Sequence, residues 1–368
     1  MIAPPAGGPS AGGQRRFVTS DLVILIGAAI FVALAGITYY AGANSVLAFV
    51  CASGAVAMLA SLVARSVEQL GDRFGAGATG VLQSALGNLP ELFIAFFALR
   101  AGLLTVVQSA VIGSMLANLL LVLGAAFVVG GLRHGPQKFE KTRARDTCVL
   151  LTLATAALVL PSVAQYSHSP AEPHVKALSD AVAVVLLVIF ALSLPAAIRR
   201  SPTASAADDT PPRAEPRWPL WLAVSLLVVS SGAAALVSDW FVEALQPTIH
   251  TLHLSQAFAG LVVVAIASNA IENVVGVQLA FKNQADYALS VIINSPLQIA
   301  LVLAPALVLL SFFTVTTFTL VFVPMLVCAV VVTVLIVSLI VFDGESNWLE
   351  GATLIGLYVI IAAVFWWG

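Results

Sequence analysis

Long apolar runs, separated by short polar stretches, cover most of the chain. A membrane-spanning helix needs about 20 mostly apolar residues, and a window of that length predicts eleven such helices. The runs are continuous and do not alternate in ten-residue pieces, which argues against a β-barrel. We therefore expect an all-α polytopic membrane protein. The predicted spans cover residues 20–40, 44–64, 76–100, 103–130, 146–166, 177–198, 218–240, 256–282, 285–311, 314–342 and 348–367.

The composition supports this fold class. Hydrophobic residues make up 60% of the 368 residues and charged residues only 9%, against about 25% charged in soluble domains. A soluble globule of this size could not cover its surface with so few polar side chains, and a disordered chain would need low hydrophobicity. The net charge of −2 gives no basis for nucleic-acid binding. We expect the lipid bilayer and inorganic cations as partners, and the sequence leaves the oligomeric state open.

The basic residues indicate which way the chain crosses the membrane. If the N-terminus is cytosolic, fourteen of the sixteen Lys and Arg residues fall in cytosolic segments, and only Arg100 and Lys176 fall outside. This bias follows the positive-inside rule. It predicts an integral membrane protein with a cytosolic N-terminus and an outside C-terminus, which we place in the inner or plasma membrane of a bacterium.

A polar stretch rich in proline and alanine, residues 201–216, divides the chain into two halves. Its composition predicts a mobile cytosolic linker. The expected organisation is a disordered cytosolic tail (1–19), a first transmembrane helix (20–43), a first five-helix repeat (44–200), the linker, and a second five-helix repeat (217–368).

The two halves carry the same motif at a constant offset. Asn88 and Glu91 are three residues apart, and Asn269 and Glu272 repeat this pair 181 residues later. A serine follows each glutamate by 23 residues. In the predicted topology the first motif crosses from inside to outside and the second from outside to inside. Inverted repeats are typical of secondary transporters, whose substrates bind near the midplane between the repeats.

Glu91 and Glu272 lie deep inside apolar runs, whereas the other sixteen acidic residues fall in loops or near predicted span ends. A charge at that depth costs on the order of 2.5–3.5 kcal/mol, so a buried carboxylate in a span indicates a functional site. Gly87 and Pro90 weaken the helix beside Glu91. A helix broken in this way exposes carbonyl oxygens to a cavity.

Neutral oxygen ligands accompany the two acids. Carboxylate, hydroxyl, amide and carbonyl oxygens suit Ca²⁺, which binds 6–8 oxygens at about 2.3–2.6 Å. No His or Cys joins the cluster, which argues against softer metals. The candidate cation- and proton-binding residues are Glu91 and Glu272. The supporting residues, which could instead hold helices together by hydrogen bonds, are Asn88, Ser114, Asn118, Ser268, Asn269, Ser295 and Gln298.

The same chemistry favours coupling to protons. Two close carboxylates in a low-dielectric cavity would take up protons in the absence of metal and release them when a divalent cation binds. Cation and protons would then compete for the same oxygens, and alternating access would convert this competition into antiport. We expect no cofactor, with Ca²⁺ and H⁺ as the transported ions.

Three segments resemble the cation/proton exchangers of the calcium/cation antiporter superfamily. Residues 87–124 resemble the first signature region of that family, residues 130–139 the connector that follows it, and residues 268–301 the second signature. The resemblance implies that Glu91 and Glu272 are the essential acids. It also implies supporting ligands, namely Ser114, Asn118, Ser295 and Gln298.

The second signature departs from the family pattern. The family commonly has Gly at Ser268, His at Asn273, and Gly-Ser-Ser-Thr-Gln at residues 294–298, where this chain has Asn-Ser-Pro-Leu-Gln. Asn294 and Pro296 would reshape the mouth of the site. The departures bear on ion selectivity more than on the class of transport.

Other function classes remain as alternatives. A Na⁺/Ca²⁺ exchanger would also use inverted repeats, an ion channel is a remoter alternative, and an intramembrane protease would need two buried acids, expected as Asp. ATP-driven pumping has no support, since no phosphate-binding G-x-x-x-x-G-K-[S/T] motif occurs. The histidine pairs His168/His174 and His250/His253 could sense outside pH or be solvated loop residues. We expect a secondary transporter and not an enzyme.

Overall fold

A computed structural model of the chain describes residues 17–74, 82, 86–199 and 217–367, without the side chains of 72, 74, 195–199, 271 and 272. The predicted linker (201–216), most of the predicted tail (1–19) and the Glu272 side chain therefore lie outside the described part.

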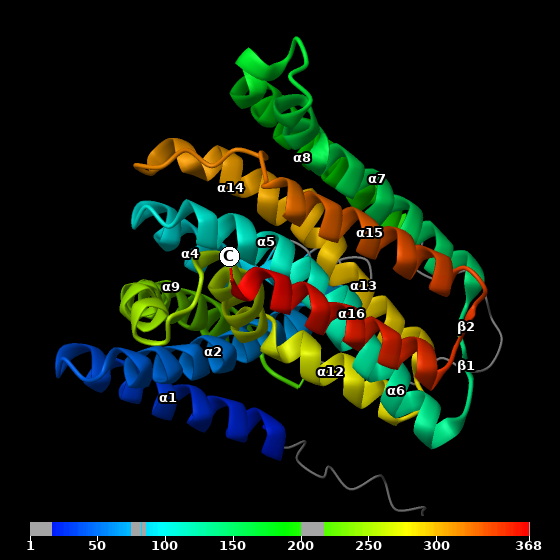
Figure 1. Cartoon of the computed structure of the whole chain (residues 1–368). Helices are drawn as coiled ribbons and strands as arrows, with labels where there is room; N and C mark the ends of the chain where they lie inside the picture. The colour runs from blue at the N-terminus through cyan, green and yellow to red at the C-terminus, as the bar shows by residue number, and fades with distance from the viewer. Residues whose placement is uncertain (1–16, 75–81, 83–85, 200–216, 368) are drawn as a thin grey trace, which may run out of the picture.

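The described chain is almost entirely helical. Figure 1 shows one bundle with α1 and α2 along one side, α7 and α8 along the opposite side, and α5, α6, α12 and α13 between them. The α-helices are α1 (Thr19–Tyr40), α2 (Ser45–Phe74), α4 (Leu89–Arg100), α5 (Leu104–Leu116), α6 (Leu123–His134), α7 (Lys141–Tyr166), α8 (Val175–Arg199), α9 (Leu220–Thr251), α10 (Gln256–Phe258), α11 (Ala265–Ser268), α12 (Ala270–Phe281), α13 (Ala285–Gln298), α14 (Ala304–Leu310), α15 (Pro324–Val341) and α16 (Trp348–Trp366).

Shorter elements interrupt or connect these helices. Three π-helical turns lie inside longer helices, two 3₁₀ turns lie at helix ends, and two short antiparallel strands pair at one end of the bundle (Figure 1). These elements are η1 (Ala117–Val122), η3 (Ala259–Val264) and η4 (Ile299–Leu303), the 3₁₀ turns η2 (Glu172–His174) and η5 (Ser311–Phe313), and the strands β1 (Gln137–Lys138) and β2 (Glu345–Ser346).

Ten of the eleven predicted spans have a counterpart among the described residues. Nine helices are long and apolar enough to cross a membrane, and one bent pair, Gln256–Ser268 with Asn273–Phe281, passes the same test with a 60° bend. The remaining predicted span, 76–100, is described mainly as α4, so its full length is not tested. The all-α polytopic fold class is confirmed.

Two predicted spans are too short. Helix α2 continues ten residues beyond the predicted end at 64, and α9 continues eleven beyond 240. Glu68 and Glu243, which lie beyond the two predicted ends, are therefore within helices. A span predicted from hydropathy ends where charged residues begin. The helix itself continues as long as its backbone hydrogen bonds and one packed face remain.

The predicted span 314–342 is wrong over its first ten residues, because the helix begins only at Pro324. The β-branched residues of this stretch disfavour a helix, and Val323, which precedes the proline, has extended backbone (φ −59°, ψ 146°). Side chains from other helices satisfy the irregular backbone, as a membrane interior requires. These bonds are Ser162 Oγ to Leu320 O (3.0 Å), Phe322 N to Ser162 Oγ (2.8 Å), Leu320 N to Ser179 Oγ (3.2 Å) and Gln108 Nε2 to Val321 O (2.7 Å).

The 181-residue offset of the motifs extends to the backbone. Helix α4 covers 89–100 and α12 covers 270–281, while α5 begins at 104 and α13 at 285. Asn88 and Asn269, at the breaks before α4 and α12, have φ/ψ of −94°/15° and −97°/19°. Gly102 and Asn283 both have positive φ, 77° and 61°. The two halves therefore repeat the same broken-helix geometry.

Equivalent helices of the two halves run antiparallel. Gln69, near the end of α2, accepts a hydrogen bond from the N–H of Trp218 just before α9 (3.1 Å), while Phe49 near the start of α2 contacts Phe241 in the far half of α9 (4.8 Å between centroids). Helices α7 and α15 also run antiparallel, since β1 precedes α7 and pairs with β2, which follows α15. This orientation is the one that inverted repeats require.

One acid that the sequence places near a span end is in fact buried. Asp21, in the first turn of α1, is 3% exposed, and its Oδ2 lies 3.5 Å from Arg217 Nη1. Phe17 packs on Trp218, and Arg73 Nη2 donates to the Trp218 carbonyl (2.6 Å). The start of α1 is thus bonded to the segment that leads into α9.

Candidate functional site

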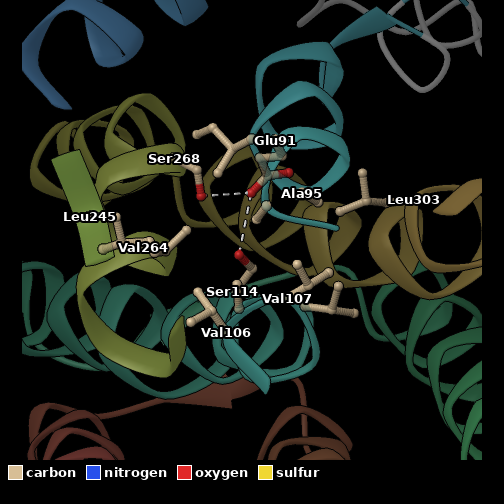
Figure 2. A pocket seen from close by; sticks show the side chains of 13 residues that line it. Glu91, Ala95, Val106, Val107, Ser114, Leu245, Val264, Ser268 and Leu303 are labelled. Atoms are coloured by element: carbon tan, nitrogen blue, oxygen red, sulfur yellow. Dashed lines mark hydrogen bonds between the residues drawn. The ribbon is translucent and has the colours of Figure 1, made fainter. Parts of the chain in front are cut away.

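The motif of the first half and the motif of the second half meet in the middle of the bundle. Glu91 lies in the first turn of α4, directly after the break at Asn88. Ser268 and Asn269 lie at the break between α11 and α12. Figure 2 shows Glu91, Ser114 and Ser268 pointing toward one another from α4, α5 and α11.

Glu91 accepts hydrogen bonds from both halves of the chain. Its Oε1 lies 2.6 Å from Asn269 Nδ2, 3.2 Å from Ser268 Oγ and 3.3 Å from Ser114 Oγ. The glutamate is 8% exposed and Asn269 is 1% exposed. Donors aimed at one carboxylate oxygen compensate the cost of burying its charge.

Asn118 extends this network to α13. Its Nδ2 donates to Asn269 Oδ1 (2.9 Å) and to Ser114 O (3.0 Å), and lies 3.3 Å from Ser295 Oγ. Asn118 is fully buried, and its Oδ1 has no hydrogen-bond partner among the described residues. Five of the seven predicted supporting residues are thus joined to Glu91 in one network: Ser114, Asn118, Ser268, Asn269 and Ser295.

Asn88 and Gln298 form a second contact between the halves. Asn88 Nδ2 lies 3.5 Å from Gln298 Oε1, which mirrors the Asn269–Asn118 bond, because each pair joins the break asparagine of one half to an amide of the other. Glu272 lies in the first turn of α12, at the place equivalent to Glu91 in α4. Its side chain is not described, so its role stays a prediction.

The two halves approach backbone to backbone beside the network. A Cβ on Gly113 would lie 2.3 Å from the Leu261 carbonyl oxygen, and a Cβ on Gly260 would lie 2.3 Å from that of Val106. Only glycine allows α5 and η3 to cross this closely, in the manner of small-residue helix contacts in membranes. The crossing is adjacent in sequence to Ser114.

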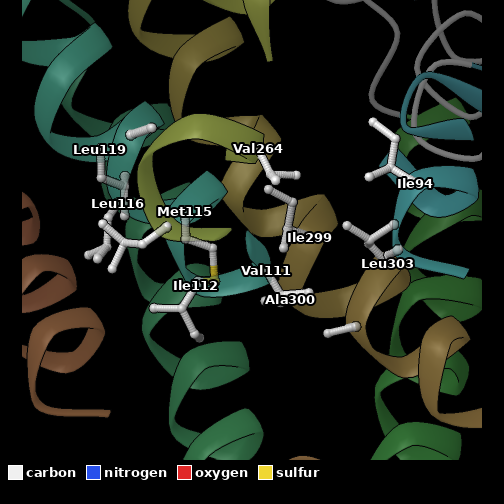
Figure 3. Packing of buried hydrophobic residues seen from close by; sticks show 14 of the residues in the cluster. Ile94, Val111, Ile112, Met115, Leu116, Leu119, Val264, Ile299, Ala300 and Leu303 are labelled. Atoms are coloured by element: carbon white, nitrogen blue, oxygen red, sulfur yellow. The ribbon is translucent and has the colours of Figure 1, made fainter. Parts of the chain in front are cut away.

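Apolar side chains enclose the network. Figure 3 shows Ile94, Met115, Val264, Ile299 and Leu303 packed together from both halves, and all five are buried. A cavity of about 20 Å³, room for roughly one water molecule, has Glu91, Ser114 and Ser268 at its polar end (Figure 2). Its remaining lining is apolar: Ile94, Ala95, Ala98, Val106, Val107, Ala110, Val111, Leu245, Val264 and Leu303.

Two features of the site have no signal in the sequence. The Ala265 carbonyl lies 3.0 Å from Asn269 Nδ2, but a backbone oxygen cannot be recognised from residue types. The π-helical turns η1 and η4 follow Ser114 and Ser295 at nearly equivalent places. One extra residue per turn is typical of functional sites, but it leaves an apolar pattern unchanged.

The chain is similar over most of its length to proteins of a described family. The model of the family described as sodium/calcium exchanger protein matches residues 44–199 and 221–367. A Ca(2+)/H(+) antiporter of Aphanothece halophytica is 33% identical over 357 residues, covering 93% of this chain and 96% of that protein. The Ca(2+)/H(+) antiporter ChaA of Bacillus subtilis is 36% identical over 309 residues, covering 83% and 88%.

A solved structure shares the fold. The structure of native YfkE superposes with a TM-score of 0.79 at 32% identity, covering 94% of this chain and 100% of that chain.

Proposed function

Because this chain belongs to the sodium/calcium exchanger protein family, we propose that it exchanges Ca²⁺ for H⁺ across a membrane by alternating access. The chain is an integral membrane protein and a secondary transporter, not an enzyme. The relatives named as Ca(2+)/H(+) antiporters support Ca²⁺ and H⁺ as the exchanged ions. The inner or plasma membrane of a bacterium, with the N-terminus cytosolic and the C-terminus outside, remains part of the proposal.

The observation that carries the proposal is the buried Glu91 carboxylate, which contacts hydroxyl and amide groups from both halves. Glu91 and Glu272 bind either the cation or protons, because a protonated carboxyl is a poor ligand for a metal. The ligands come from two broken helices of opposite orientation. A relative movement of the halves therefore changes which side of the membrane reaches the site.

The proposal is tested with purified protein in liposomes. We expect an outward-directed or inward-directed pH gradient to drive ⁴⁵Ca²⁺ movement against the proton flux, with Glu91→Gln and Glu272→Gln reduced to the level of protein-free vesicles. Glu68→Gln is the matched control, because Glu68 is half exposed on α2 and pairs only with Arg65 among the described residues; we expect its exchange to equal wild type.

The alternative coupling ion is tested in the same vesicles. The family description favours Na⁺ as a second candidate. Uptake that follows a Na⁺ gradient and ignores the pH gradient would replace proton coupling by Na⁺ coupling. Full exchange by Glu91→Gln would refute the role of the buried carboxylate.

A further inference from the structure

Four oxygen atoms surround the side-chain nitrogen of Asn269. Its Nδ2 lies 2.6 Å from Glu91 Oε1, 2.9 Å from Ser114 Oγ, 3.0 Å from the Ala265 carbonyl and 3.2 Å from Ser268 Oγ. A carboxylate, two hydroxyls and a backbone carbonyl are hard ligands of the kind that Ca²⁺ binds. Ca²⁺ binds oxygen at about 2.3–2.6 Å. A cation at the place of this nitrogen would already be within that distance of Glu91 Oε1, and the other three oxygens would have to move closer, Ser268 Oγ at 3.2 Å by the most.

The neighbours of Asn269 fix the orientation of its amide. The Ala265 carbonyl can only accept, so the amide atom beside it must be the nitrogen. On the other side, Asn269 Oδ1 accepts from Asn118 Nδ2 (2.9 Å), and Asn118 Nδ2 is itself oriented by the Ser114 carbonyl (3.0 Å). The N–H groups of Asn269 therefore face Glu91.

An amide nitrogen and a cation cannot share this place. The nitrogen of a side-chain amide donates hydrogen bonds and does not accept them, so it cannot serve as a metal ligand. It has two N–H groups for four acceptor atoms, which leaves part of the oxygen set available to a stronger partner. Cation binding by these oxygens and the observed position of the Asn269 nitrogen exclude each other.

We propose that the Asn269 amide is an internal competitor of the transported cation, holding Glu91, Ser114 and Ser268 until a hard cation displaces it. The inference rests on the proposed function and assigns Asn269 a positioning role, not that of a ligand through its nitrogen. Displacement breaks the bond between Asn269 and Glu91, which joins the two halves at their helix breaks. Cation binding thus changes a contact on which the relative position of the halves depends.

The other half of the chain supplies a matched control. Asn88 occupies the equivalent break with nearly the same backbone angles, but its amide nitrogen lies beside Gln298 Oε1 at 3.5 Å. Gly87 stands at the place equivalent to Ser268 and has no hydroxyl. A substitution at Asn88 therefore disturbs a break asparagine without removing the nitrogen that faces Glu91.

The test is the Ca²⁺ dissociation constant of full-length protein in detergent, measured by calorimetric titration at fixed pH without any gradient. We expect Asn269→Ala to bind Ca²⁺ on the order of tenfold more tightly than wild type, because a charge-assisted hydrogen bond no longer competes. Asn88→Ala should not bind more tightly. Asn269→Leu, which has nearly the shape of asparagine and neither donates nor accepts hydrogen bonds, should repeat the tightening and decides the matter if the alanine variant does not fold.

Weaker or unchanged Ca²⁺ binding by the Asn269 variants would overturn the inference. Weaker binding would mean that the amide assists cation binding, and unchanged binding would mean that the amide does not compete with the cation. Equally tighter Ca²⁺ binding by Asn88→Ala would also overturn it. The effect would then come from removing an asparagine at either helix break and not from the amide beside Glu91. The proposed function is tested separately, by exchange of the wild-type protein in liposomes. If wild type binds Ca²⁺ but does not exchange it for protons, the proposed exchange is refuted, and the Ca²⁺ affinities of the variants can still be compared. Wild type that binds no Ca²⁺ would overturn both.

Discussion

Ser162 of α7 supports the irregular segment before α15, and its removal gives a sharp prediction about stability. The side chain is 1% exposed; its hydroxyl donates to the Leu320 carbonyl (3.0 Å) and accepts from the N–H of Phe322 (2.8 Å). Ser162→Ala removes one oxygen atom and leaves both backbone groups without that partner, in a segment that has no helical hydrogen bonds of its own.

The expected loss of stability follows from the two backbone groups that lose their hydrogen-bond partner, the Leu320 carbonyl and the Phe322 N–H. An unsatisfied buried donor or acceptor costs about 1–3 kcal/mol, and the carbonyl, with two lone pairs, tolerates the loss better than the N–H. We therefore expect Ser162→Ala to lower the free energy of unfolding by about 2–4 kcal/mol. Ser179→Ala removes one bond to this segment, from Leu320 N at 3.2 Å, and a bond within α8 to the Val175 carbonyl (2.8 Å). Because only the Leu320 N–H belongs to the irregular segment, the substitution should cost about 1–2 kcal/mol.

The measurement is SDS-induced unfolding of the protein in mixed micelles, followed by tryptophan fluorescence. Ser61→Ala is the control, because among the described residues the Ser61 hydroxyl bonds only the Ala57 carbonyl of its own helix (3.0 Å). It should change stability by less than about 0.5 kcal/mol. A Ser162→Ala protein as stable as Ser61→Ala would refute the idea that this hydroxyl satisfies the segment.

Two further substitutions test contacts between the halves and at the start of α1. Gly113→Ala should destabilise the protein by about 1–3 kcal/mol and reduce exchange, since its Cβ would lie 2.3 Å from the Leu261 carbonyl; Gly356→Ala, with open space around it, should do neither, and equal melting temperatures would contradict the close crossing. Arg217→Gln should cost about 2–3 kcal/mol, because it leaves Asp21 buried without its cation. Adding Asp21→Asn should restore most of that loss, and additive losses in the double-mutant cycle would show that the two side chains do not interact.

The sequence predicts the centre of the site because the energetic signal there is strong. A glutamate in an apolar run is costly wherever it lies, so Glu91 stands out, and the repeated Asn-x-x-Glu spacing identifies the asparagine that contacts it. Ser114, Asn118 and Ser268 follow because hydroxyls and amides in spans must find partners. The structure joins these residues in one network.

The features that sequence reasoning misses depend on backbone conformation or on distant partners. Residues 314–323 pass a hydropathy window, which measures side chains and is insensitive to whether the backbone is helical. The oxygen that bonds Phe322 comes from Ser162, 160 residues away, and the cation that pairs with Asp21 is Arg217. Apolar periodicity contains no information on such pairs.

The two halves share the backbone geometry of their helix breaks but differ in the side chains beside them. An exchanger needs both the shared geometry and the difference in side chains. Matching breaks at Asn88 and Asn269 allow two related conformations with similar packing, which alternating access requires. A glycine at position 268, as at the equivalent Gly87, would leave Glu91 without a hydroxyl from the opposite half. Instead, Ser268 stands where the first half has Gly87, so Glu91 receives a hydroxyl from the opposite half. The departure of the second signature at Ser268 thus acts on the acid of the first motif, for which we propose competition between a cation and protons.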